Sequence, residues 1–272
     1  MFVGLSAFPL TPMGDEAAFE RLVARLAAAG VDSIGALGST GSYAYLTREE
    51  RARAARLAVG AADGVPVMTG IGATRTERVI EHALDAQDAG VSAVMLAPVS
   101  YQVLTDDEVF GLFTDVTAAI SIPLCVYDNP GTTRFTFSDD LHARVAALPN
   151  VSAIKLPGPG AAERIEPLRA RVPSHVALGV SGDEYAAGAL DAGADVWFSV
   201  IGGLFPEPAL QIVRERRSEH LEPLWALFRA HGGIRVVATM AVRLGLARED
   251  VLPRPLKLLD PVTVDPVLML LR

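Results

Sequence analysis

Cysteine is nearly absent from the 272-residue sequence, and so are segments that would carry a protein into or across a membrane. The single cysteine, Cys125, excludes an internal disulfide and suits a reducing compartment. It lies in the apolar run Ile122–Val126, where we expect a buried, inert thiol and not a nucleophile. No run reaches the roughly eighteen apolar residues that a membrane span requires, and the N-terminus lacks the basic leader and apolar segment of a signal peptide. We therefore expect a cytoplasmic protein without membrane association.

Positive charge is also scarce, since the formal net charge at pH 7 is -8. Binding to nucleic acid or to anionic lipid needs basic patches, and the run Arg214–Arg217 is short and interrupted by glutamate. The five histidines are scattered without the spacing of metal ligands, so we expect ordinary surface residues at His82, His142, His175, His220 and His231. These features exclude a nucleic-acid partner and predict no metal site.

Lysine is the scarcest charged residue: only two of the 24 basic residues are lysines, Lys155 and Lys257. Lys155 ends the apolar run Val151–Lys155, where a lone cation is costly to desolvate unless it gives up its proton. Arginine cannot replace a lysine that must become a neutral amine, because the guanidinium stays protonated. Two interpretations remain open from these residues alone. Lys155 is a nucleophile, or it only reaches from a strand end to water or to a carboxylate.

Hydrophobic residues make up 50% of the chain, and apolar, β-branched runs alternate with longer amphipathic stretches. The predicted strands are Val3–Phe8, Ser33–Ala36, Val67–Thr69, Ala93–Ala97, Leu124–Tyr127, Val151–Lys155, Val176–Gly179 and Val196–Val200. The predicted helices between them are Glu16–Ala29, Arg48–Gly60, Thr76–Ala89, Asp106–Ile120, Ser138–Ala147, Ala162–Arg171 and Glu184–Ala192. After the eighth strand only helices are expected, over Glu207–Arg229, Val236–Leu246 and Val264–Leu271.

A weak internal repeat accompanies this alternation. Ala-Gly pairs ending at Gly30, Gly90 and Gly193 each indicate a helix C-terminus with a left-handed glycine cap, followed by a short turn and the next strand. Eight strands with this cadence predict an α/β protein with a (β/α)8 TIM barrel, and an open doubly wound sheet is the second possibility. We expect residues 1–205 to form the barrel and residues 206–272 to form helices packed on it, within a single domain.

Catalytic groups of such barrels gather at the C-terminal ends of the strands. Lys155 and Tyr127 end adjacent predicted strands, and a neutral lysine amine can attack a ketone to form an electron-withdrawing Schiff base. Tyr127 would serve as a proton shuttle, or it is a core tyrosine with a satisfied hydroxyl. The loop Gly38–Gly41 offers closely spaced backbone N–H groups and two hydroxyls suited to a carboxylate, although small residues also fill ordinary turns.

Several of these segments resemble one protein family. Gly38–Ser42 resembles the Gly-Thr-Thr-Gly-Glu segment of the dihydrodipicolinate synthase and N-acetylneuraminate lyase family. Tyr127-Asp-Asn-Pro130 resembles its Tyr-Asn-x-Pro motif, and Ala153-Ile-Lys155 resembles its Schiff-base strand. Two further segments match the family, Ala7–Pro12 and Ser181–Asp183, so that the resemblance covers roughly the first 205 residues.

The resemblance implies a class I aldolase or lyase that acts on pyruvate or another 2-oxo acid without metal or cofactor, commonly as a homo-oligomer (dimer or tetramer). Lys155 would form the imine and Tyr127 would relay protons, while Ser39 and Thr40 would bind the substrate carboxylate. Further substrate contacts are expected in the loops after the strands, at Thr132, Ser181, Gly182, Ser199 and Gly202.

Departures from the family pattern bear on the substrate. The arginine that binds the second substrate's carboxylate in lysine-biosynthetic members is replaced by Thr132, with Arg134 two residues later. The paired tyrosines that follow a proline are missing after Pro98, because Tyr101 is displaced by one residue, and Ser42 stands where glutamate is usual. We therefore expect action on a 2-keto-3-deoxy sugar acid, by aldol cleavage or dehydration, and not dihydrodipicolinate synthesis itself.

Two other functions remain open besides dihydrodipicolinate synthesis. A phosphate-binding barrel would use the glycines of Gly179–Gly182 and Gly202-Gly203, which follow strands where barrels often bind phosphate. That function leaves Lys155 and Tyr127 unexplained together. A catalytically silent ligand-binding barrel would be expected to lack the imine-forming lysine, and this sequence has one.

Overall fold

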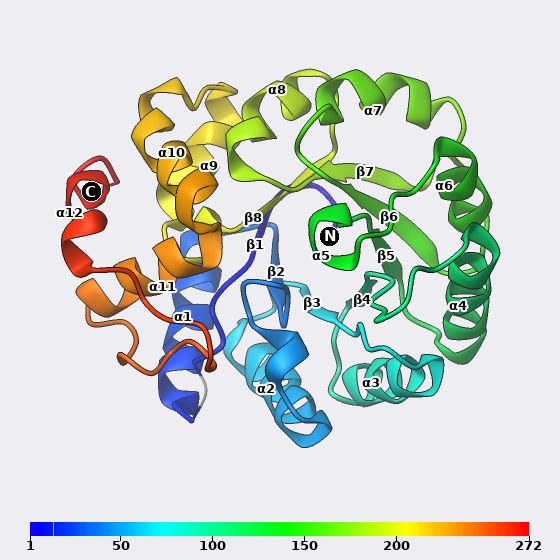
Figure 1. Cartoon of the computed structure of the whole chain (residues 1–272), viewed down its shortest axis with the longest axis horizontal. Helices are drawn as coiled ribbons and strands as arrows, with labels where there is room; N and C mark the ends of the chain where they lie inside the picture. The colour runs from blue at the N-terminus through cyan, green and yellow to red at the C-terminus, as the bar shows by residue number, and fades with distance from the viewer. Residues whose placement is uncertain (13, 272) are drawn as a thin grey trace.

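Eight short parallel strands close into a barrel (Figure 1). The computed structural model describes residues 1–12 and 14–271, so Arg272, the last residue of the predicted C-terminal region, lies outside it. The strands are β1 Gly4–Ala7, β2 Ser33–Ala36, β3 Val67–Gly70, β4 Ala93–Leu96, β5 Leu124–Tyr127, β6 Val151–Leu156, β7 Ala177–Val180 and β8 Val196–Ser199. Each pairs with the next in parallel, and β8 returns to pair with β1. The TIM barrel is confirmed, and the open doubly wound sheet was the wrong alternative.

Helices surround the strands in chain order (Figure 1). They are α1 Glu16–Ala29, α2 Arg48–Ala61, α3 Thr76–Asp88, α4 Asp106–Ala119, α6 Asp139–Ala146, α7 Ala161–Arg169, α8 Ala186–Asp191 and α9 Pro206–Glu215. The short helix α5, Pro130–Thr133, was not predicted and crosses the centre of the barrel end that faces the viewer in Figure 1. Three short 3-10 helices lie between a strand and the helix that follows it. They are η1 Tyr43–Tyr45, η2 Asp183–Tyr185 and η3 Ile201–Gly203.

Side chains alternate along each strand between the barrel interior and the surrounding helices. One apolar cluster, which includes Met95, Cys125 and Val196, fills the interior. The other lies between the strands and the helices and includes Val126 and Ile154. Successive residues of a strand face opposite sides. Since Cys125 faces the interior, Tyr127 also faces inward and Asp128 faces outward.

Local signals in the sequence set where the helices begin and end. Thr47 accepts from the backbone N–H of Glu50, whose carboxylate accepts from the backbone N–H of Thr47, so the capping box that opens α2 is complete. Gly30, Gly90 and Gly193 have φ values of 76°, 84° and 94°. These left-handed conformations favour glycine and turn the chain from a helix into the next strand.

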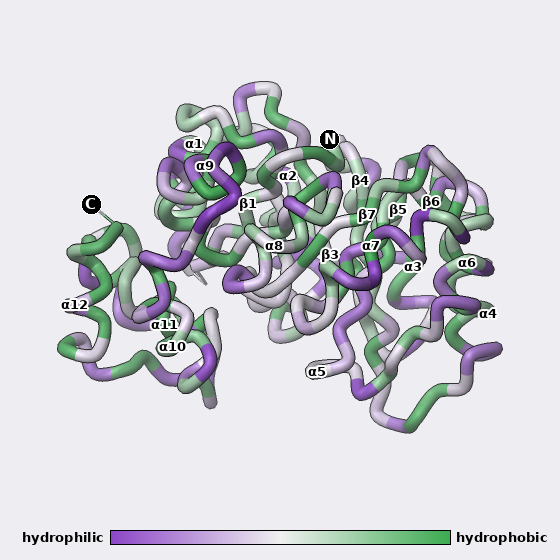
Figure 2. The backbone as a smooth tube through the Cα atoms, turned by 90° about the horizontal axis from the view of Figure 1, so that it is seen from above, coloured by the Kyte–Doolittle hydropathy of each residue, from purple (hydrophilic) through white to green (hydrophobic). Residues whose placement is uncertain are grey.

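The C-terminal region was only partly predicted. It contains α9, η4 Glu219–Leu221, α10 Glu222–His231, α11 Gly233–Arg243, η5 Pro261–Thr263 and α12 Asp265–Leu268. The expected single helix Glu207–Arg229 is wrong: α9 ends where Arg216 adopts φ 58°, and Pro223 lies in the first turn of α10, where its missing N–H costs nothing. Figure 2 shows α10, α11 and α12 on one side of the barrel. A domain boundary at residue 205 stays a prediction.

Bilayer-spanning helices are not found in the part of the chain that the structure describes, since none of its helices is long and apolar enough.

Candidate active site

Lys155 and Tyr127 are direct partners in the pairing of β6 with β5. Both side chains point into the barrel, because they continue the inward positions of Ala153 and Cys125. The backbone N–H of Asp128 donates to the carbonyl oxygen of Lys155 over 3.0 Å, which extends the pairing beyond the end of β5. Lys155 is 4% exposed and Tyr127 8%. The strand alternation therefore places an amine and a phenol together in a nearly dry site.

Three aromatic rings surround the amine. Its Nζ lies 4.1 Å from the ring centroid of Phe8, 4.0 Å from that of Tyr127 and 5.4 Å from that of Phe198. Burial lowers the pKa of Lys155 to about 7, although the nearby Cys125 and Asp183 favour the protonated form. A substantial fraction of the amine is thus neutral near neutral pH, in contrast to an exposed lysine. The interpretation of Lys155 as a side chain that reaches out to water does not fit its burial.

The phenol of Tyr127 and the thiol of Cys125 stay neutral beside the amine. Burial raises the pKa of Tyr127 to about 12, while the Ser39 hydroxyl acts in the opposite direction. Burial also raises the pKa of Cys125 to about 12, which agrees with the expected inert thiol. Tyr127 therefore holds a proton that it can donate to a group bound at Lys155.

The loop Gly38–Gly41 follows β2 and leads into η1. Ser39 is exposed, and Thr40 is buried. A side chain at Gly41 would come within 2.8 Å of Thr11 Oγ1 and 3.0 Å of the Leu37 nitrogen, so the loop requires glycine there to pass this close to the backbone. A side chain at Gly38 would come within 2.5 Å of the ring of Phe8, whose centroid lies 4.1 Å from Lys155 Nζ, so this loop passes beside the site.

Asp183 holds the loop after β8 through its side chain. Its carboxylate accepts hydrogen bonds from Trp197 Nε1 at 3.1 Å and from the backbone N–H groups of Val200 at 3.0 Å and Ile201 at 2.6 Å. Burial raises the pKa of Asp183 to about 6, and these donors oppose that rise. The carboxylate thus fixes η3 and places a negative charge near Lys155.

The remaining predicted substrate contacts are engaged with their own chain. Thr132 is exposed, and its hydroxyl accepts from Asn129 Nδ2. The Ser181 hydroxyl donates to the Leu156 carbonyl, and Ser199 Oγ accepts from the backbone N–H of Gly202. Gly182 is exposed and Gly202 is buried. A substrate-binding role for these residues stays a prediction.

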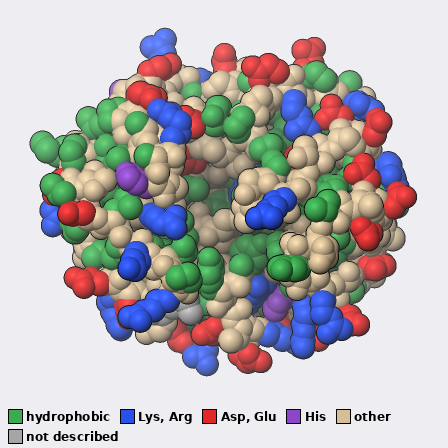
Figure 3. Space-filling model, in the orientation of Figure 1, with side chains coloured by type: hydrophobic (Ala, Val, Ile, Leu, Met, Phe, Trp, Pro, Cys, Tyr) green, Lys and Arg blue, Asp and Glu red, His purple; other side chains and the backbone are tan. Residues whose placement is uncertain are grey.

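Two residues at the departures from the family pattern lie in exposed positions. Tyr101 is 92% exposed in the loop between β4 and α4, so it does not reach the amine of its own chain. Arg134 is also exposed, with φ 58° at the end of α5. Figure 3 shows the molecule in the orientation of Figure 1, with a hollow at the centre of the face turned to the viewer.

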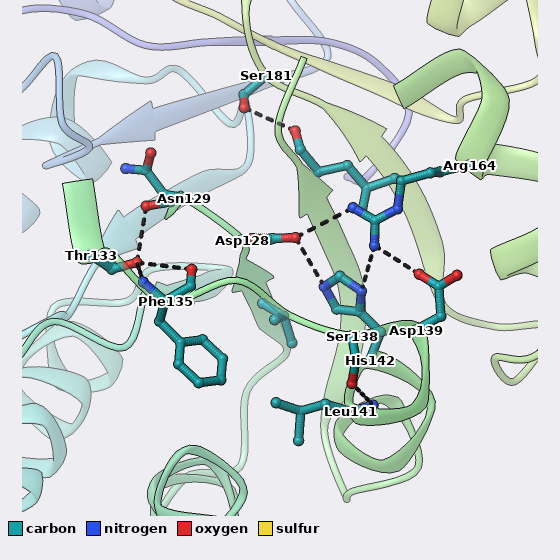
Figure 4. Close-up of polar contacts among 12 residues, drawn as sticks. Asp128, Asn129, Thr133, Phe135, Ser138, Asp139, Leu141, His142, Arg164 and Ser181 are labelled. Carbon is teal, nitrogen blue, oxygen red and sulfur yellow. Dashed lines mark hydrogen bonds and ion pairs between the residues drawn. The ribbon is translucent and has the colours of Figure 1, made fainter. Parts of the chain in front are cut away.

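A second polar cluster lies on the outer side of β5 (Figure 4). Asp128 Oδ2 is 3.5 Å from His142 Nε2 and 3.6 Å from Arg164 Nη1, and Arg164 also donates to Asp139 over 2.8 Å. Burial raises the pKa of Asp128 to about 6 and lowers that of His142 to about 3. His142 is fully buried and stacks on Phe137 with centroids 4.8 Å apart. The expectation of a surface histidine was wrong at this position.

Phe8, Phe198 and Asp183 were given no role in the site from the sequence, although Phe8 and Asp183 lie in segments that match the family. Their signal was weak but present: Phe198 lies two residues after the inward Val196, and Phe8 has the inward parity of Ser6. Within residues 1–12 and 14–271, no three His, Cys, Asp or Glu side chains converge in a way that could hold a metal ion. The chemistry that this arrangement supports is carbonyl condensation at an amine.

Comparison with known proteins identifies the family of this chain. The family model described as the dihydrodipicolinate synthetase family matches residues 1–261. The crystal structure of dihydrodipicolinate synthase from Agrobacterium tumefaciens shares 44% identity, covers 100% of this chain and 98% of that one, and superposes with a TM-score of 0.96. The 4-hydroxy-tetrahydrodipicolinate synthase of Salinibacter ruber is 30% identical over 246 residues, 84% of this chain and 81% of that protein.

A more distant structure has the same fold. The dihydrodipicolinate synthase of Acinetobacter baumannii, solved in complex with pyruvate, shares 24% identity, covers 99% of this chain and 97% of that one, and has a TM-score of 0.88, which attests the fold. The family assignment makes the protein a lyase of the class I aldolase type, which forms a Schiff base between a lysine and its substrate and uses no cofactor. With the barrel and the buried amine in place, the match over residues 1–261 shows that this chain belongs to the dihydrodipicolinate synthetase family.

Proposed function

We propose that Lys155 is the lysine that forms the Schiff base, and that the 2-oxo acid is pyruvate or a close relative. The observation that carries this proposal is the buried amine, held inside the barrel with its pKa lowered to about 7. The second lysine, Lys257, is exposed near the C-terminus and lacks such surroundings. An amine that is neutral near pH 7 is the nucleophile that imine formation requires.

The neighbouring residues have consistent roles in this proposal. The amine of Lys155 attacks C2 of the 2-oxo acid, and the carbinolamine takes up one proton and releases one water to leave the iminium. Tyr127, with its phenol protonated, supplies and later recovers the proton. Ser39 and Thr40 bind the carboxylate through hydroxyls and through N–H groups of the loop Gly38–Gly41.

The second substrate has two candidates. Relatives that bear the name 4-hydroxy-tetrahydrodipicolinate synthase make that synthesis at least as well supported as action on a 2-keto-3-deoxy sugar acid, which the sequence favoured. The sugar-acid candidate retains one supporting observation, namely that Thr132 takes the place of the family arginine and that its hydroxyl is occupied by Asn129. Aldol cleavage, condensation and dehydration all proceed through the same iminium.

Borohydride reduction in the presence of pyruvate tests the central proposal. We expect intact-protein mass to rise by one reduced pyruvate adduct and peptide mapping to place it on Lys155. Lys257→Arg should leave the adduct unchanged, whereas Lys155→Arg should remove it. An adduct on Lys257, or no adduct with any common 2-oxo acid, would refute the proposal. Tyr127→Phe should reduce turnover far more than imine formation, and equal losses would make Tyr127 a structural residue.

Parallel kinetic assays separate the two candidate substrates. The enzyme is supplied with pyruvate and the four-carbon amino aldehyde that completes the 4-hydroxy-tetrahydrodipicolinate ring, and in parallel with a panel of 2-keto-3-deoxy acids. Preference is expressed as the ratio of kcat/KM values. Turnover with only one of the two sets of substrates assigns the substrate class. Thr132→Arg, assayed with those substrates, then tests whether Thr132 contributes to this preference.

We also propose that the protein is a homo-oligomer, a dimer or a tetramer. The loop after β4 exposes two large side chains, Tyr101 at 92% and Val103 at 87%, on a surface where burial against another copy would be favourable. Sedimentation equilibrium measures the assembly directly, and a monomer at micromolar concentration would contradict the proposal. The expected cytoplasmic location stays a prediction.

A further inference from the structure

Phe8 lies in the barrel interior beside the amine of Lys155. It follows β1 at an inward position and is 2% exposed, with its ring centroid 4.1 Å from Lys155 Nζ. Its backbone N–H donates to the Ser199 carbonyl over 2.9 Å, which fixes the residue against β8. The Phe198 ring meets it edge to face at 6.1 Å and 81°. The ring orientation is therefore set by the barrel itself.

Glycines make room for this ring. A side chain at Gly35 or at Gly38 would overlap the ring of Phe8, and one at Gly203 would overlap its backbone carbonyl. Gly35 lies within β2, where glycine weakens a strand. The chain thus keeps glycine at a position that favours larger residues, and the space is taken by an aromatic face turned to the amine.

An aromatic face distinguishes the charge states of the amine. The negative face of the ring attracts a cation within about 6 Å, and the attraction grows when water is excluded. The neutral amine that attacks the carbonyl gains little from it. The iminium that follows carries a positive charge on the same nitrogen, so it is attracted by the Phe8 ring in the same place. The ring therefore attracts the positive charge that develops as the iminium forms more strongly than it attracts the neutral amine, and only such a difference between transition state and ground state accelerates the step.

We propose that Phe8 is a further catalytic residue, which stabilises the iminium formed on Lys155 through its ring face. The proposal rests on the proposed role of Lys155. It goes beyond that role because it assigns the charge stabilisation to an apolar side chain that carries no proton and makes no hydrogen bond through its ring. It also accounts for the combination of Phe8 with Gly35 and Gly38.

Substitution of Phe8 by leucine tests the ring face, because leucine stays apolar and keeps water out. We expect Phe8→Leu to lower the equilibrium constant for the iminium with pyruvate about tenfold, within the range of roughly 2- to 30-fold that such contacts support. It should also move the pH midpoint of adduct formation downward, because the protonated amine loses the same attraction. Phe8→Ala should move the midpoint upward, because water enters beside the amine.

Fluorinated phenylalanines at position 8 provide a test that does not depend on how Phe8→Leu packs. They keep the size of the ring and progressively weaken its negative face, so the iminium constant should fall stepwise with fluorine number. Phe113→Leu is the matched control: Phe113 is equally buried but lies in α4, and its loss should reduce stability without changing the iminium constant.

The outcomes separate the two proposals. If wild-type protein forms no adduct on Lys155, the proposed function fails. If wild type forms the adduct and both Phe8→Leu and the fluorinated variants keep its equilibrium constant and pH midpoint, the role of Phe8 fails alone. A loss of stability in Phe8→Leu with an unchanged constant also overturns it, since that result identifies a packing residue.

Discussion

Replacing Lys155 with methionine should stabilise the protein while it removes imine formation. Methionine is unbranched like lysine and carries no charge, so it can fill the same space inside the barrel. Burial lowers the pKa of Lys155 from 10.5 to about 7, so the folded state releases this proton well before the unfolded chain does. One pKa unit corresponds to about 1.4 kcal/mol, and the buried lysine therefore costs the folded state about 5 kcal/mol at low pH.

The cost depends on pH in a defined direction. Below pH 7 both states hold the proton and the full cost of about 5 kcal/mol applies. Between pH 7 and 10.5 only the unfolded chain holds it, so wild-type stability rises with pH by about 1.4 kcal/mol per unit from this group. The advantage of Lys155→Met should accordingly shrink to about 2 kcal/mol at pH 9.

Urea unfolding followed by circular dichroism, at pH 6.5 and pH 9 and at one protein concentration, measures this difference. Lys257→Met is the matched control, because Lys257 is exposed and its replacement should change stability little at either pH. If Lys155→Met is less stable than wild type at pH 6.5, or if its advantage is the same at both pH values, the buried amine does not carry the desolvation cost described here.

Three further substitutions test the supporting structure. Asp183→Asn should lower the unfolding free energy by about 1–3 kcal/mol in urea, because its amide nitrogen would face one of the three donors; an unchanged value would contradict the hydrogen-bond network. Arg164→Met should cost about 2 kcal/mol by leaving Asp128 buried beside no cation, whereas Asp128→Asn should cost less than about 1 kcal/mol, and equal shifts in thermal unfolding would refute this asymmetry. Gly35→Ala should cost about 3 kcal/mol through overlap with Phe8, and the same substitution should cost much less in a chain that already carries Phe8→Ala; an equal loss of melting temperature in both backgrounds would show that the overlap is not the cause.

The barrel could be predicted because its signals are local. β-branched runs of four to six residues, bounded by glycine caps such as Gly30 and Gly90, identify strands and helix ends without knowledge of their partners. Lys155 was recognisable for a different reason. A lysine in an apolar strand is conspicuous in a chain that otherwise uses arginine, and Tyr127 ends the neighbouring strand.

The surroundings of the site were harder to predict because they depend on tertiary contacts. The contact of Phe8 with the amine joins the residue that follows β1 to a residue on β6, and it exists only once the barrel closes. His142 looked like a polar residue on an amphipathic helix, and its burial depends on the outward carboxylate of Asp128 and on Arg164 from the next helix. The break at Arg216 follows from a single backbone conformation that the amphipathic pattern does not encode.

Because Lys155 is buried and Lys257 is exposed, digestion by a lysine-specific protease can report whether Lys155 carries an adduct. A protease that cuts after lysine would divide the unfolded chain into three fragments, 1–155, 156–257 and 258–272. In the folded protein it meets only Lys257, so the first cut should release the segment that begins at Leu258. A reduced adduct on Lys155 blocks the other site even after unfolding, and the two larger fragments then appear as one. The occupancy of the active amine can thus be measured as a ratio of fragments.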